Sequence, residues 1–216
     1  IVAALDFRMP PDAAYPAALA DVNYAVRYFK SQAPELRTPA KRIGLLGTSS
    51  GGHLAMTVAM KPRDARYSAL ELYGGFDATV RCVIMGWPVI DPLGRYRHAI
   101  RLKEGGDPGL ANHVLDDHHR FWGTEEAMAE GSPTLALERG DAVETPPVLY
   151  VQGTADYNHP RENLDRFVAG YRARGGRVEL NMIGGEKQLF IPQNPGSAGS
   201  RYALEKIVQF AQRELQ

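Results

Sequence analysis

The sequence feature that most constrains the fold is the pentapeptide Gly47–Gly51, which reads G-T-S-S-G and matches the pattern G-x-S-x-G. A short apolar run typical of a buried strand precedes it, and helical spacing follows it to about residue 60. A serine on a sharp turn between a strand and a helix presents its hydroxyl for nucleophilic attack. We therefore predict that Ser49 is a nucleophile in a protein of the α/β class.

The residues around Ser49 have predicted roles of their own. The backbone N–H of Ser50, at the start of the helix, is expected to donate to an oxyanion with help from the helix dipole. The glycines two positions on either side of Ser49 are expected to let strand and helix approach closely. His53, one helical turn along, is expected to be a packed core histidine. The alternative, a glycine-rich turn without chemistry, is weakened by the flanking strand and helix.

Strand and helix patterns alternate along the rest of the chain. The expected strands cover 1–7, 43–47, 80–89, 147–151 and 178–183, and the expected helices cover 17–31, 51–60, 161–174 and 202–215. This alternation predicts one domain over 1–216, with a mostly parallel sheet and helices on both faces. The polar stretch from about 91 to 141 is longer than an ordinary connection, so we expect a partly helical insertion over the strand ends.

Charge and cysteine content exclude several classes of partner. Lysine and arginine total 25 and aspartate and glutamate total 25, with no run of like charge, which argues against nucleic acid and anionic membrane surfaces. No apolar run reaches the roughly 18 residues that a membrane-spanning helix needs. The single cysteine, Cys82, lies in an apolar run, which predicts a buried thiol and fits a reducing, cytoplasmic location.

Asp156 is the candidate acid of a catalytic triad. A serine hydroxyl needs a base to take its proton, and the base needs an acid to orient it. Asp156 ends a tight turn just after the expected strand 147–151, where its side chain would face the crevice at the end of the sheet. An aspartate that only closes its turn or caps the next helix is the alternative. His159 is not expected to be the base, because the chain order and spacing differ from those of a triad.

Three segments, 6–22, 47–55 and 152–156, resemble the hormone-sensitive-lipase-like esterases of the α/β-hydrolase fold, and the resemblance covers nearly the whole chain. It implies a carboxylic ester hydrolase that acts through an acyl-enzyme and needs no metal or organic cofactor. Two departures stand out. The HGG-type oxyanion loop of the family is absent, and the family's G-x-x-H-x-F pattern reads Gly185–Phe190 here, with Gln188 in the place of the histidine.

Gln188 decides what such a site can do. A neutral amide is not a base, so Gln188 can hydrogen-bond to Ser49 but cannot take its proton. Losing a triad member lowers turnover by about 10⁴- to 10⁶-fold. Because Ser49 and Asp156 are retained, the sequence favours an esterase site inactivated by one substitution, native or engineered, over gradual drift. The alternative is a non-catalytic member of the fold that binds a small molecule or a protein.

The remaining candidates have weaker signals. Trp87, Phe121 and Trp122 are candidates for the wall of a substrate pocket, with core packing as the alternative. The histidines of the insertion lack a cysteine or carboxylate at metal-binding spacing, so a solvated surface is expected for His113, His118 and His119. The expected partner is a small-molecule ester. The sequence does not specify the acyl or alcohol group or the oligomeric state, and an amide, thioester or lactone substrate is an alternative to the ester.

The start of the chain carries a further expectation. The apolar run 1–7 has no basic n-region and no initiator methionine, and it is read as a strand inside a domain. The resemblance places the first strands and the oxyanion loop before residue 1. We therefore expect an upstream segment, or a separate chain, to complete the domain, because a sheet that lacks those strands exposes an edge.

Overall fold

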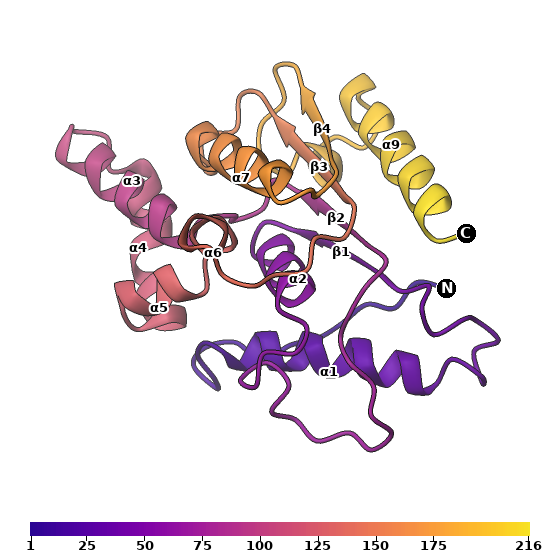
Figure 1. Ribbon diagram of the computed structural model, residues 1–216. Coiled ribbons are helices and arrows are strands. Elements are labelled where there is room, and N and C mark those ends of the chain that lie inside the picture. The colour runs from indigo at the N-terminus through magenta and orange to yellow at the C-terminus, as the bar shows by residue number, and fades with distance from the viewer.

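A four-stranded parallel sheet lies at the centre of the computed structural model, which describes residues 1–216 (Figure 1). The strands are β1 (Gly44–Thr48), β2 (Cys82–Gly86), β3 (Val148–Gly153) and β4 (Val178–Ile183). They lie in the order β1-β2-β3-β4, and every neighbouring pair is parallel. The carboxyl ends of all four strands therefore meet along one edge of the sheet. The predicted α/β class with a parallel sheet is confirmed.

Helices cover both faces of this sheet. One face carries α1 (Ala17–Ser31), α2 (Ser50–Met60) and α7 (Arg161–Ala173), and the other carries α9 (Ala198–Glu214) (Figure 1). The short helix α8 (Phe190–Gln193) lies between β4 and α9. Except for α8, which was not expected, these helices fall near the predicted ranges. Helices α1, α7 and α9 bury one apolar side, whereas α2 is buried along nearly its whole length.

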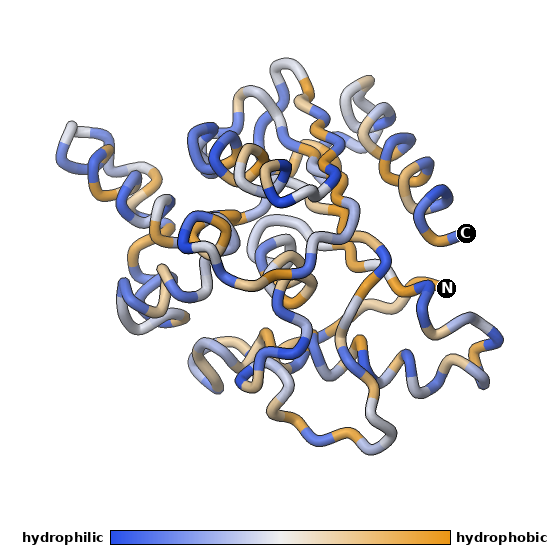
Figure 2. The backbone as a smooth tube through the Cα atoms, in the orientation of Figure 1, coloured by the Kyte–Doolittle hydropathy of each residue, from blue (hydrophilic) through white to orange (hydrophobic).

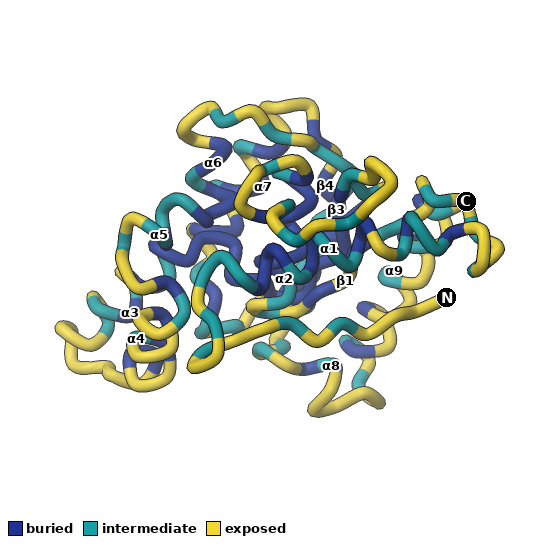
Figure 3. The backbone as a smooth tube through the Cα atoms, turned by 90° about the horizontal axis from the view of Figure 1, so that it is seen from below, coloured by how far each residue is buried: buried dark blue, intermediate teal, exposed yellow.

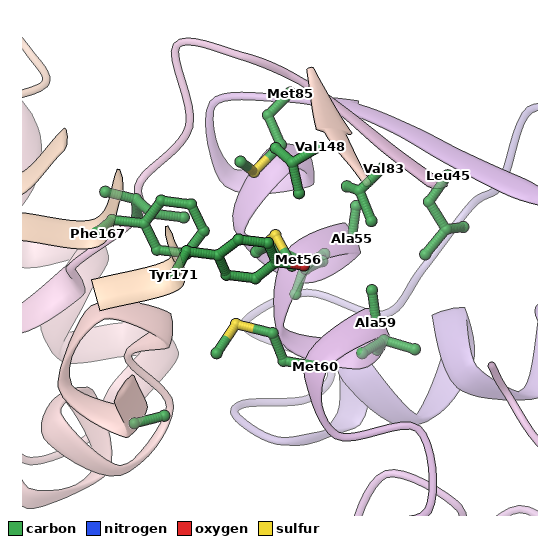
Figure 4. Packing of buried hydrophobic residues seen from close by; sticks show 14 of the residues in the cluster. Leu45, Ala55, Met56, Ala59, Met60, Val83, Met85, Val148, Phe167 and Tyr171 are labelled. Carbon is green, nitrogen blue, oxygen red and sulfur yellow. The ribbon is translucent and has the colours of Figure 1, made fainter. Parts of the chain in front are cut away.

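The alternation of side chains along each strand divides the core in two. Leu45, Val83, Val148 and Val178 form one row across the sheet and belong to the larger cluster, under α1, α2 and α7. Figure 4 shows side chains of α2 and α7 meeting Val83 and Val148 in this cluster. Alternate strand residues such as Ile84 point to the opposite face, where they pack with α9. Both faces of β2 and β3 are therefore buried.

The apolar start of the chain departs from the expectation. The predicted strand at 1–7 is wrong: residues 1–9 contain no strand and are largely exposed, although they are strongly apolar at their beginning (Figures 2 and 3). Their side chains border an apolar groove along β1, and β1 pairs only with β2. Leu46 of β1 borders this groove and is 61% exposed. An apolar run becomes a strand only where a partner strand pairs with it.

The stretch between β2 and β3 folds as a group of helices to one side of the sheet (Figure 1). We call it the cap segment, and its helices are α3 (Pro92–Glu104), α4 (Gly109–Trp122), α5 (Glu125–Glu130) and α6 (Pro133–Arg139). The buried Asp91 caps α3 by accepting from the Gly94 N–H, and it also binds Ser132 and Arg166. These bonds join the start of the cap segment to α6 and to α7.

Two expectations from composition can be compared directly with the structure. Cys82 is buried in β2, as predicted, and burial raises the pKa of its thiol to about 11. The helices are all too short or too polar to cross a lipid bilayer.

Candidate active site

Ser49 lies on a sharp turn between β1 and α2, at the carboxyl edge of the sheet. Its backbone has φ 50° and ψ −119°, in the positive-φ region that residues with a side chain rarely adopt. Two hydrogen bonds hold it there: the Ser49 N–H donates to the Gly86 carbonyl at 2.9 Å, and the Val89 N–H donates to the Ser49 carbonyl at 3.1 Å. The neighbouring strand thus fixes the backbone that carries the hydroxyl.

The glycines around Ser49 have unequal importance. A Cβ atom on Gly47 would lie 2.2 Å from the Gly51 carbonyl oxygen, and one on Gly52 would lie 2.8 Å from Pro88 Cβ. A Cβ atom on Gly51 would meet nothing within 4 Å. The expectation of a steric role is therefore right for Gly47 and wrong for Gly51. On the helix side, Gly52 is the residue that lies close to the chain after β2.

A cavity of about 410 Å³ opens beside Ser49 and Ser50. Residues of the cap segment form one wall of it, including Phe121 and Trp122, and Met9 with Pro10 borders another side. The two aromatic residues thus lie where a substrate could contact them. Ser50 stands at the first position of α2, where backbone N–H groups have no partner within the helix.

Trp87 does not belong to this cavity. It is fully buried on the α9 face, and its ring packs edge-to-face on Phe190 with 5.3 Å between the centroids. Its backbone φ is +39°, which turns the chain sharply after β2. For Trp87 the structure supports core packing, the alternative weighed beside the pocket role.

Asp156 follows β3, and its side chain is completely buried, with both of its oxygens occupied. Oδ1 accepts from the backbone N–H groups of Asn158 at 2.9 Å and His159 at 3.2 Å. Oδ2 lies 2.9 Å from His159 Nδ1. This pair of side chains was not among the expectations, which considered His159 only as a triad base. The D-x-x-H spacing across a turn was the available signal, because a turn can bring residues three apart together.

His159 is nearly sealed from solvent at 3% exposure, and its Nε2 has no hydrogen-bond partner. Burial lowers its pKa, although the carboxylate of Asp156 opposes the effect. His159 lines a narrow gap separate from the Ser49 cavity, and Val89 and Arg95 border both spaces. The Asp156–His159 pair therefore lies behind the cavity wall.

Gln188 lies in the turn between β4 and α8, beside the turn that carries Asp156. Its Oε1 accepts a hydrogen bond from Asn158 Nδ2. No hydrogen bond joins Ser49 to Asp156 or to Gln188. The structure thus brings positions 156 and 188 together through Asn158, and Ser49 faces the adjoining cavity.

Two histidines of the cavity wall are buried, and burial was predicted for only one of them. His53 is packed as expected: its Nε2 lies 2.8 Å from the Gly131 carbonyl oxygen, and burial lowers its pKa to about 4. The expectation of a solvated surface is wrong for His118, which is 6% exposed because α4 turns it inward. Burial and the nearby Arg95 charge lower the pKa of His118 to about 3. His113 and His119 are exposed.

Comparison with known proteins finds similarity to esterases. A family model described as BD-FAE matches residues 1–167. Esterase LipC of Mycobacterium tuberculosis is 25% identical over 205 residues, which cover 93% of this chain and 48% of LipC. The chain thus spans about half the length of this curated relative.

Solved structures show the same fold. A Thermogutta terrifontis esterase with propionate bound has a TM-score of 0.71 and 24% identity, over 96% of this chain and 70% of that one. Carboxyl esterase 2 of Tuber melanosporum has a TM-score of 0.75 and 19% identity, over 98% of this chain and 67% of that one. Together with the parallel sheet, these matches show an α/β-hydrolase fold.

Proposed function

Because this chain belongs to the BD-FAE family, a family of α/β-hydrolase esterases, we propose that it is a serine carboxylesterase whose catalytic base position is occupied by Gln188. In this proposal Ser49 attacks the ester carbonyl and forms an acyl-enzyme. The N–H of Ser50 donates to the oxyanion. Asp156 is the acid that would orient a histidine at position 188.

The observation that carries the proposal is the backbone of Ser49. A positive φ at a residue with a side chain persists only where the surrounding structure enforces it, and such strain clusters at functional sites. Here two hydrogen bonds to the chain at the end of β2 enforce it, and the residue borders a cavity large enough for a small ester. A turn without chemistry needs neither the strain nor the cavity.

The chain as it stands is proposed to be inactive or nearly so. Gln188 can accept and donate hydrogen bonds, but it cannot take a proton from Ser49 or return one to a leaving alcohol. Its amide oxygen is already bound to Asn158. Residual turnover would come from binding and oxyanion stabilisation alone.

The direct test is hydrolysis of a short-chain p-nitrophenyl ester by the protein and by its Gln188→His variant. We expect turnover only in the variant, and we expect Ser49→Ala in the Gln188→His background to remove it. If the histidine variant is folded but as inactive as the parent, the assignment of position 188 is wrong. Turnover that survives Ser49→Ala would contradict the nucleophile.

A non-catalytic binding protein is the second candidate, and one observation favours it. The groups that a triad would use have found other partners: Asp156 binds His159, and Gln188 binds Asn158. This arrangement is complete without Ser49. A Gln188→His variant that stays inactive while the protein binds a neutral ester in the Ser49 cavity would favour this candidate.

We also propose that a further strand pairs with β1. The outer edge of β1 has no partner, Leu46 is exposed, and the groove beside it is almost entirely apolar. An upstream segment or a separate chain would supply the strand. Native mass spectrometry of the folded protein should show mass beyond residues 1–216; a folded monomer of this mass alone would refute the proposal. The single buried thiol supports a cytoplasmic location.

A further inference from the structure

A half-buried cation lies in the Ser49 cavity without an acceptor for most of its donors. Arg95, near the start of α3, lines the cavity and donates from Nε to the Asn158 carbonyl at 2.9 Å. Its two terminal nitrogens form no hydrogen bond or ion pair with the protein, and neither is sealed from solvent. Burial lowers the pKa of Arg95 to about 10, which leaves it charged at neutral pH.

No charged side chain nearby forms an ion pair with Arg95. The other charged side chains that line the cavity are Asp117 and Arg120, which lie 3.9 Å apart and offset each other. Asp156 and Asp117 both favour the charged form of Arg95, but neither forms an ion pair with it. The oxygens of Asp156 are already taken by His159 and by backbone N–H groups. The terminal nitrogens of Arg95 therefore keep free donors at the cavity wall.

The two buried histidines of the cavity do not change this balance. Burial lowers the pKa values of His53 and His118 to about 4 and about 3, so both are neutral at physiological pH. Apolar side chains, including Leu54, Val89 and Phe121, make up much of the remaining wall. An ion pair formed in such surroundings is screened less by water than one on the open surface.

We propose that the Ser49 cavity selects esters that carry a free carboxylate, such as the monoesters of short dicarboxylic acids, and that Arg95 binds that carboxylate. The ester in this inference rests on the proposed function, and the preference for a carboxylate rests on Arg95. The planar guanidinium can hold both carboxylate oxygens through parallel hydrogen bonds. A neutral ester in the same place would bury the guanidinium without an acceptor, which disfavours its binding.

The test is a binding measurement that needs no turnover. Isothermal titration calorimetry compares monomethyl succinate with dimethyl succinate, which differ by one charge and one methyl group, on the whole protein and two variants. Arg95→Met removes the proposed contact. Arg97→Met is the matched control, because Arg97 lies on the same helix, is 57% exposed and pairs with Glu125 outside the cavity.

We expect the protein and Arg97→Met to bind the monoester about 10- to 100-fold more tightly than the diester, as befits a hydrogen-bonded charge. Arg95→Met should lose this preference, and Arg95→Lys, which keeps the charge but not the planar fork, should keep a smaller part of it. Thermal unfolding checks that each variant is folded. If Arg95→Met is not folded, Arg95→Lys alone is compared with the parent protein.

Equal binding of the two esters, no detectable binding of the monoester, or a preference that survives loss of the guanidinium would overturn the inference. The failure of the proposed function looks different. A carboxylate preference without turnover in Gln188→His would leave Arg95 as the anion site of a binding protein. Turnover in Gln188→His without a carboxylate preference would leave the esterase and remove the role of Arg95.

Discussion

Two histidines would compete for Asp156 in a reactivated enzyme. In the present structure Asp156 accepts three hydrogen bonds, one of them on Oδ2 from His159 Nδ1 at 2.9 Å. An ionised carboxylate offers about four lone-pair sites, so one site remains. A histidine introduced by Gln188→His would have to share Oδ2 with His159 to be oriented toward Ser49.

The cost of that sharing can be estimated. Replacing the acid of a triad by an amide lowers kcat about 10⁴-fold, which corresponds to about 5.5 kcal/mol. A hydrogen bond to a charged group is worth about 1.5 to 3 kcal/mol, so halving it through competition costs about 4- to 12-fold in rate. We expect Gln188→His to raise kcat at least about 100-fold, and His159→Leu in that background to raise it about tenfold further.

The assay is steady-state hydrolysis of p-nitrophenyl butyrate, with folding checked by thermal unfolding. His159→Leu should also destabilise the protein by about 1 to 3 kcal/mol, because it removes a partner of a buried carboxylate. In the native Gln188 background, we expect His159→Leu to leave the low rate unchanged. If that variant instead abolishes a measurable native activity, His159 is the base and position 188 is not. A double variant no faster than Gln188→His alone refutes the competition.

Three further predictions concern stability and reactivity. Gly52→Ala should lower the free energy of unfolding by about 1 to 3 kcal/mol in urea titrations, because its Cβ would lie 2.8 Å from Pro88 Cβ, whereas Gly51→Ala should stay near parental stability; equal losses would contradict the packing argument. The pKa of His53 is about 6.5 in the unfolded chain and about 4 in the folded protein. Its contribution to the free energy of unfolding is therefore complete above pH 6.5 and is lost as the pH falls to 4. This loss amounts to about 3 kcal/mol at most. In His53→Gln, the urea midpoint should depend less on pH than in the parent protein. An unchanged pH dependence would exclude His53 as the source of the loss. Burial raises the pKa of Cys82 to about 11, so Ellman's reagent should label it at the rate of unfolding, and fast labelling of the native protein would show that the thiol is open.

Local patterns were sufficient for most of the fold. Apolar residues recur with the spacing of a strand or a helix in the segments around Ser49 and in the strands 148–153 and 178–183. Such local spacing predicts these elements without knowledge of their partners. The start of the chain was misjudged because an apolar run shows that a segment avoids water and not that a strand lies beside it. Apolar character alone does not decide between a strand and an unpaired segment over a groove.

The site was harder to predict because its contacts join segments far apart in the sequence. Motif spacing pointed to Ser49 and Asp156, but nothing local showed that Arg95 donates to Asn158, 63 residues away. The burial of His118 could not be predicted, because its inward direction depends on how α4 packs in the cap segment. Trp87 follows β2 directly, and only the turn after that strand decides which face of the sheet it covers.

The spatial order of the strands matches their order in the chain, and this has a consequence for synthesis. Each strand pairs with the strand made just before it, so no strand has to enter between two that have already paired. A chain leaving the ribosome could extend its sheet by one strand at a time from β1 to β4, with the cap segment emerging between the second and third additions. The glutamine at position 188 and the turn that holds it would emerge only after β4.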